Sequence, residues 1–185
     1  MRTFIAIDLD PEIKKTLFQL IDELDKGHKN IRWVRHGGMH LTFKFLGEIN
    51  REKVSEIENV LNRISKKYEP FILKFKGTGY FPPQKKNPRV LWVGIEEEET
   101  LTALQSQVEE ELEKLGFPRE RRKFHAHLTL GRVKSLSNIR ETISLLEKYR
   151  ERNFGEMKAD KITFFQSILK PTGAEYSVLS EFDLK

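Results

Sequence analysis

The chain has no cysteine among its 185 residues. Disulfide bonds, thiolate zinc sites and a cysteine nucleophile are therefore excluded, and we expect a cytoplasmic protein. Long apolar runs are also missing, because no stretch approaches the roughly 20 apolar residues of a membrane span. The first residues, MRTFIAIDLDPE, lack the cationic start and apolar run of a signal peptide. The sequence thus predicts no membrane partner.

The chain has fewer acidic than basic side chains, 28 against 33, and its formal net charge is +5. A basic balance favours a polyanionic partner, whereas a solvated surface of mixed charge is the alternative interpretation. Two local clusters favour the first interpretation. Their basic side chains are Lys85, Lys86, Arg89, Arg119, Arg121, Arg122 and Lys123.

The apolar periodicity predicts alternating strands and helices. Runs rich in β-branched and aromatic residues predict strands at 3–9, 31–35, 39–47, 71–80, 89–95, 124–133, 161–169 and 174–182. Helical spacing of apolar residues predicts helices over 11–24, 54–64, 101–115 and 136–146. The glycines at 37 and 38 suggest that the second and third strands form a hairpin.

The order of strand, helix, strand, helix, strand occurs twice along the chain. We therefore expect an α+β fold in which residues 1–185 form a single domain of two pseudo-symmetric lobes. Two sheets, mixed or antiparallel, would face a central cleft with the helices outside, and the lobes could exchange terminal strands. A cleft between such lobes is a common place for a ligand.

One short motif stands at matching places of the two halves: His-Leu-Thr-Phe at 40–43 and His-Leu-Thr-Leu at 127–130. Side chains alternate between the two faces of a strand. In the first copy Leu41, Phe43 and Phe45 would share the core face. His40, Thr42 and Lys44 would share the opposite face.

The second copy repeats this arrangement. Leu128 would point into the core, while His127 and Thr129 would share the opposite face with His125. Two such strands facing each other would gather two imidazoles and two hydroxyls around one small volume.

These groups suit the opening of a cyclic phosphodiester. Histidine titrates near pH 6.5, so one ring can accept a proton from water while the other protonates the departing ribose oxygen. The hydroxyls of Thr42 and Thr129 can donate hydrogen bonds to the phosphate oxygens. This chemistry requires no metal and no cofactor. The His-x-His pair at 125 and 127 is a poor zinc site, because no carboxylate or cysteine stands at a supporting spacing.

Three aromatic side chains, those of Trp33, Phe81 and Trp92, are candidates for stacking on a base. Phe81 stands beside Pro82 and the lysine pair, and is the better candidate. Trp92 alternates with Leu91 and Val93, and we expect it in the core.

At this point the sequence resembles a known family. The segments RTFIAIDL, RWV, HLTFKFLGE and FHAHLTLGRV are similar to those of the two-histidine phosphoesterases, specifically the RNA 2′,3′-cyclic phosphodiesterases, also called 2′-5′ RNA ligases. The resemblance covers nearly the whole chain. Where the family often has proline before the second histidine, this chain has Ala126, which leaves the chemistry untouched.

The resemblance implies roles for individual residues. His40 would be the proton donor to the leaving 3′ oxygen and His127 the proton acceptor for water, with a 2′-phosphate as product. The family also uses the arginine of the second motif's tail, here Arg132, on the phosphate. Simple alternation places Arg132 on the core face, unless Gly131 allows a bulge that redirects it. RNA contacts are expected from Phe81, Lys85, Lys86, Arg121 and Arg122.

The expected partner is RNA with a 2′,3′-cyclic phosphate end, tRNA fragments included, and the expected state is a monomer. An ATP-independent 2′-5′ RNA ligase at the same site is one alternative, in which a ribose 5′-hydroxyl replaces water. A non-catalytic module that binds RNA or a nucleotide is another. A small cyclic phosphate, such as an ADP-ribose cyclic phosphate, is the rival substrate class.

Overall fold

The helices and strands follow the apolar periodicity of the sequence closely. The computed structural model describes residues 1–83, 87–96, 98–171 and 173–185. Its helices are α1 (Pro11–Leu24), the short 3-10 helix η1 (His36–Gly38), α2 (Arg51–Ser65), α3 (Glu99–Lys114) and α4 (Arg140–Lys148). Its strands are β1 (Arg2–Asp8), β2 (Ile31–Trp33), β3 (His40–Glu48), β4 (Phe71–Phe81), β5 (Val90–Ile95), β6 (His127–Val133), β7 (Asn153–Ala159), β8 (Lys161–Lys170) and β9 (Gly173–Asp183).

Helix α1 shows how local chemistry sets an element. The carboxylate of Asp10 accepts a hydrogen bond from the backbone N–H of Ile13 at 2.8 Å, and Pro11 occupies the first helical turn. The apolar stripe predicted for this helix is buried. The prediction of a helix that opens at Pro11 is therefore confirmed.

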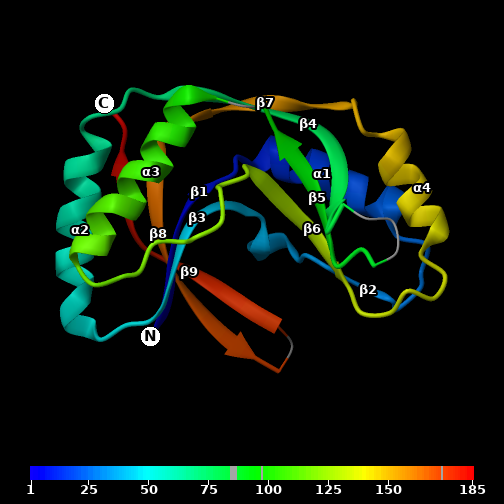
Figure 1. Ribbon diagram of the computed structural model, residues 1–185, viewed down its shortest axis with the longest axis horizontal. Coiled ribbons are helices and arrows are strands. Elements are labelled where there is room, and N and C mark those ends of the chain that lie inside the picture. Colours follow the sequence, from blue (N-terminus) through cyan, green and yellow to red (C-terminus); the bar gives the residue numbers. More distant parts are fainter. Residues whose placement is uncertain (84–86, 97, 172) are drawn as a thin grey trace.

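The strands form two sheets whose strand pairs are antiparallel. The four-stranded sheet has the order β3-β1-β8-β9 and the five-stranded sheet has the order β2-β6-β5-β4-β7. In Figure 1 the strands β8 and β9 extend as a long hairpin beyond the rest of the molecule. The expectation of an α+β fold with two lobes is confirmed, and the parallel pairs that a mixed sheet would contain are absent from the described strand pairs.

Each sheet takes strands from both halves of the chain. The opening strand of each half pairs with the motif strand of its own half, as β1 does with β3 and β5 with β6. It also pairs with a long strand of the other half, as β1 does with β8 and β5 with β4. Strand pairing crosses between the repeats four times, because β2 also pairs with β6 and β4 also pairs with β7.

The helices lie in two pairs on the outer faces of the sheets (Figure 1). Helices α2 and α3 pack on each other, and α3 contacts β3 of the four-stranded sheet. Helix α1 contacts β7 and α4 beside the five-stranded sheet. One continuous apolar core fills the space beneath both pairs. A smaller cluster of Phe4, Ala6 and Phe165 lies apart from it.

Two expectations about the elements are wrong. Residues 31–35 and 39–47 do not form a hairpin, because β2 pairs with β6 whereas β3 pairs with β1. The turn at η1 carries the chain from one sheet to the other. Strand β7 was not expected, because NFGEMKA has no β-branched residue. It forms by pairing with β4, where Phe71 lies opposite Ala159.

Candidate functional site

Both histidine motifs open on one cleft of about 1160 Å³. His40 and Thr42 come from β3 in the four-stranded sheet, whereas His127 and Thr129 come from β6 in the five-stranded sheet. All four side chains are half-buried, and Leu41 and Leu128 between them point into the core. The two imidazoles and two hydroxyls that alternation predicted on one face of each strand therefore line the same cleft.

The alternation expected for the first motif fails after Phe43. Thr42 lies opposite Ala6 and Lys44 lies opposite Ile5, so Phe43 has no partner in β1 and forms a bulge. After the bulge the two faces are exchanged. Phe45 is therefore 69% exposed and lines the cleft, instead of lying in the core with Leu41.

The same bulge turns Lys44 away from His40 and Thr42 and toward α3. Its Nζ donates to Oε2 of Glu109 at 2.5 Å and to the carbonyl of Pro118 at 2.7 Å. The two ionic side chains are only 4% and 10% exposed. The assignment of Lys44 to the histidine face was wrong, because simple alternation takes no account of a bulge.

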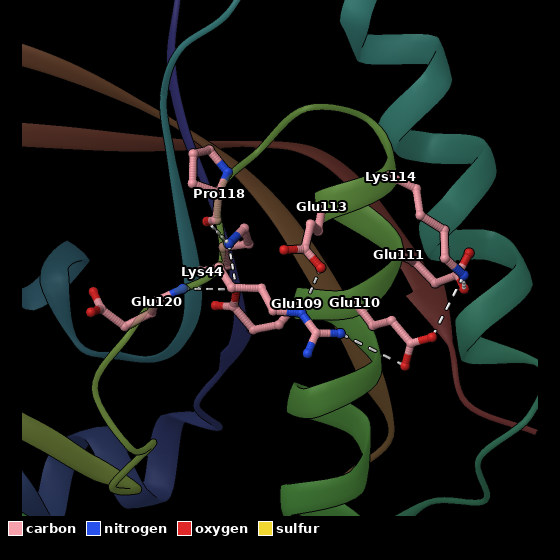
Figure 2. Close-up of polar contacts among 9 residues, drawn as sticks. Lys44, Glu109, Glu110, Glu111, Glu113, Lys114, Pro118 and Glu120 are labelled. Atoms are coloured by element: carbon pink, nitrogen blue, oxygen red, sulfur yellow. Dashed lines mark hydrogen bonds and ion pairs between the residues drawn. The ribbon is translucent and has the colours of Figure 1, made fainter.

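Figure 2 shows that this ion pair holds the segment after α3. The Glu109 carboxylate also accepts a hydrogen bond from the backbone N–H of Glu120 at 3.2 Å. Arg119 is held by Glu113 at 2.9 Å. The segment at 118–126 carries the basic cluster and leads directly into β6. Lys44 and Glu109 therefore fix the segment that leads to His127. The sequence did not predict this role for either residue.

A sequence signal for Glu109 was available. The apolar stripe of α3 contains two polar residues one helical turn apart, Gln105 and Glu109, and both are buried. Polar residues in a core-facing stripe need buried partners. Gln105 Nε2 donates to the carbonyl of Phe43 at 3.4 Å, and Glu109 takes Lys44.

Aromatic rings surround His40. Its imidazole stacks on Phe4 with centroids 4.6 Å apart, lies 5.4 Å from Phe165 and meets Tyr176 edge-on at 5.1 Å. Burial lowers the pKa of His40 from its ordinary 6.5 to about 4, against the opposing effect of the Asp8 carboxylate. In the free protein His40 is therefore neutral at pH 7.

The surroundings of His127 differ. Its Nδ1 lies 2.6 Å from the carbonyl oxygen of His125. A carbonyl only accepts, so Nδ1 carries the proton and the neutral ring keeps a lone pair on Nε2. Burial lowers the pKa of His127, and the hydrogen bond to the backbone opposes that shift. The two motifs, nearly identical in sequence, thus place their histidines in distinct settings.

Phe81 lines the cleft beside His127 and also contacts Trp92. The Phe81 ring meets His127 edge-on at 5.2 Å and lies 5.3 Å from Trp92. The prediction of Trp92 in the core was wrong. Leu91 and Val93 point into the core, so Trp92 lies on the opposite face of β5, where it is half-buried. A side chain in place of Gly79 would collide with it, because a Cβ there would lie 2.3 Å from the indole.

A bulge redirects Arg132. Leu91 pairs with Gly131 and Trp92 with Thr129, so Leu130 is the extra residue of β6. Gly131 is required there, because a Cβ would lie 2.8 Å from the Trp33 ring. As a result Arg132 is exposed and lines the cleft that contains both histidines. Of the two positions that the sequence allowed, the structure shows the one on the cleft.

The remaining candidate RNA contacts divide into two groups. Arg121 and Arg122 are exposed and line the cleft. Lys85 and Lys86 lie outside the described residues. No group of three or more His, Asp or Glu side chains that could hold a metal ion occurs among the residues that the structure describes. Within the same residues no helix is long and apolar enough to cross a membrane.

Comparison with known proteins identifies the family. The model of the LigT like Phosphoesterase family matches residues 7–92 and, a second time, residues 93–176. The chain belongs to this LigT-like phosphoesterase family. The double match agrees with the duplicated order of elements, and the resemblance found in the motifs is confirmed.

Two relatives match over all or nearly all of their length. An RNA 2′,3′-cyclic phosphodiesterase of Archaeoglobus fulgidus is 39% identical over 183 residues, covering 99% of this chain and 100% of the relative. One of Thermotoga maritima is 40% identical over 181 residues, covering 98% and 94%. Among solved structures, TT0787 of Thermus thermophilus matches with a TM-score of 0.84 and 28% identity, covering 100% of this chain and 98% of that one. E. coli LigT complexed with 3′-AMP shares the fold, with a TM-score of 0.81, 24% identity and coverage of 100% and 98%.

Proposed function

We propose that this protein hydrolyses the terminal 2′,3′-cyclic phosphate of RNA to a 2′-phosphate without a metal ion. The observation that carries the proposal is the meeting of two His-x-Thr strands, from two different sheets, on one cleft. The names of the full-length relatives support the same reaction. An acid and a base on opposite sides of a phosphate are what the reaction requires.

His127 is the base in this proposal. Its Nδ1–H is held by the carbonyl of His125, so Nε2 is free to take a proton from water. The water oxygen attacks phosphorus, and the bond from phosphorus to the ribose 3′ oxygen breaks. A proton from His40 passes to that oxygen, leaving a 3′-hydroxyl and a 2′-phosphate. Both histidines then return to their starting states by exchange with solvent.

His40 must carry a proton to act as the acid, although burial keeps it neutral in the free protein. The negative charge of a bound phosphate favours the charged imidazolium and so raises the pKa of His40. Substrate binding therefore protonates His40, and the aromatic rings around the imidazole exclude water from it. An imidazolium that is poorly solvated gives up its proton readily to the departing oxygen.

Four further groups complete the site. Thr42, Thr129 and Arg132 line the cleft with the histidines. In this proposal the two threonine hydroxyls donate hydrogen bonds to the non-bridging oxygens, and the planar guanidinium of Arg132 binds the same phosphate. Phe81 lies against His127, where it can stack on the terminal base. Arg121 and Arg122 on the cleft wall favour an RNA end over a small cyclic phosphate, as do Lys85 and Lys86 in the sequence.

The proposal is tested by turnover of a short RNA that ends in a 2′,3′-cyclic phosphate. His40→Ala and His127→Ala should each lower kcat by a factor of about 10²–10⁴, and the double variant should lose little more. His28→Ala is the matched control, because His28 is exposed and does not line the cleft. Full activity of either motif variant would refute the proposal.

A further inference from the structure

Three arginines gather at one end of the cleft, and two of them lie on elements that the proposed chemistry does not use. Arg32 of β2 lies directly opposite Arg132 of β6 in the sheet. Side chains directly opposite each other lie on the same face, about 5 Å apart at Cβ. Arg132 lines the cleft, so Arg32 extends the same face to the edge strand of the sheet.

The tip of the hairpin between β8 and β9 brings in the third arginine. A Cβ built on Gly173 would lie 3.7 Å from Nη2 of Arg32 and 3.9 Å from Nη1 of Arg35. Both guanidinium groups thus lie close to one point on the hairpin backbone. Arg35 is exposed and immediately precedes η1, which β9 contacts.

These positive charges have no acidic partner in the part of the chain that the structure describes. Arg32, Arg35 and Arg132 take part in none of its ion pairs, and the nearby Glu175 on the hairpin is bound to Lys170 at 2.6 Å. Like charges directly opposite each other in a sheet are destabilising. An anion that binds between them would relieve the repulsion and could accept paired hydrogen bonds from each planar guanidinium.

We propose that Arg32 and Arg35, next to Arg132, form a subsite for the RNA backbone, which holds a phosphodiester on the 5′ side of the terminal nucleotide. The inference rests on the proposed function, because it needs the terminal phosphate to lie between the two histidines. Arg132 lines the cleft with both histidines and lies opposite Arg32, so it is close to both the terminal phosphate and the subsite. Arg32 and Arg35 are not among the residues that line the cleft itself, so they serve the RNA strand beyond it.

This subsite assigns a path to the RNA. The strand would leave the histidines along β6 and cross β2 beneath the hairpin tip. The alternative path follows the basic segment at Arg121 and Arg122, which precedes β6. The two paths predict that substitution of different arginines will weaken RNA binding. A mononucleotide substrate cannot reach the subsite, so comparing it with a longer RNA distinguishes binding at the subsite from the chemistry.

The test compares a nucleoside 2′,3′-cyclic phosphate with a trinucleotide that has the same end. In Arg32→Gln and in Arg35→Gln, the ratio of kcat/KM for the trinucleotide to that for the mononucleotide should fall about tenfold relative to the natural protein. Arg51→Gln is the matched control, an exposed arginine of α2 that does not line the cleft, and its ratio should not change. An unchanged ratio in both variants would overturn the subsite, and so would a fall seen only in Arg122→Gln.

A second readout does not depend on turnover. The probe is a fluorescein-labelled hexanucleotide with a 3′-phosphate, and anisotropy measures its affinity as salt is varied. Loss of one phosphate contact should reduce the slope of log K against log salt by about 0.7 in Arg32→Gln. If the natural protein hydrolyses no cyclic phosphate but this slope falls, the proposed function fails and the subsite stands. If hydrolysis proceeds while the slope and the ratio stay constant, the subsite fails and the proposed function stands.

Discussion

His40 is an imidazole held among three aromatic rings, and that setting has a measurable consequence. Its folded-state pKa of about 4 lies below the 6.5 of an exposed histidine. Between these two values the unfolded chain binds more protons than the folded chain, so stability increases with pH across the window. The stabilisation is complete above pH 6.5 and is lost progressively as the pH falls toward 4.

The prediction concerns the free energy of unfolding in urea at pH 5.0 and pH 7.5. Titration of His40 should make the natural protein about 2 kcal/mol less stable at the lower pH. Acidic groups also change protonation between these pH values, so His40→Gln provides the reference. In the variant, the difference in the free energy of unfolding between pH 5.0 and pH 7.5 should be smaller by that amount. An equal difference in both proteins would show that His40 is not shifted.

At the scale of elements, the ion pair between Lys44 and Glu109 joins β3 to α3 and to the segment that enters β6 (Figure 2). Removing one partner leaves the other as a buried, uncompensated charge, which typically costs about 3–5 kcal/mol. Lys44→Met should therefore lower the free energy of unfolding by that amount, as measured in urea.

The double variant Lys44→Met/Glu109→Leu distinguishes a buried charge from a packing defect. It should recover most of the stability, because no charge is left unpaired. Its kcat/KM on RNA should stay below that of the natural protein, because the segment at 118–126 has lost the carboxylate that holds Glu120. Full recovery of both quantities would contradict the proposed anchoring of this segment.

The elements also show what a sequence can and cannot predict here. Both His-x-Thr strands and their shared cleft were predicted, because period-two alternation holds from His40 to Phe43 and from His127 to Leu130. Beyond those residues a bulge in each strand exchanges the two faces. Alternation alone therefore could not predict on which face Lys44, Phe45 and Arg132 lie. The pairing of β2 with β6 depends on contacts far apart in sequence, so the arrangement of Arg32 with Arg132 could not be foreseen.

At the scale of the whole molecule, the crossed pairing of strands makes the two repeats interdependent. Strand β1 needs β8 and strand β5 needs β4, and in each pair the partner belongs to the other repeat. One apolar core is shared by both sheets. Neither repeat can separate from the other without breaking strand pairs in both sheets, and neither sheet can separate from the other without exposing the shared core.

Urea unfolding should therefore be a single transition. Trp33 and Trp92 both belong to the five-stranded sheet, so tryptophan fluorescence reports on that sheet alone. Far-ultraviolet circular dichroism reports on all helices and strands. The two probes should give the same midpoint within error. Two separate midpoints would mean that the sheets unfold independently, which would contradict the single apolar core that they share.

The central claim is that two histidines open a cyclic phosphate toward a 2′-phosphate without a metal. The most direct measurement incubates the natural protein, in EDTA, with a short RNA ending in a 2′,3′-cyclic phosphate and identifies the product by ³¹P NMR. The account predicts a single 2′-phosphomonoester, formed at the same rate with and without EDTA. A 3′-phosphate, or loss of turnover in EDTA, would contradict it.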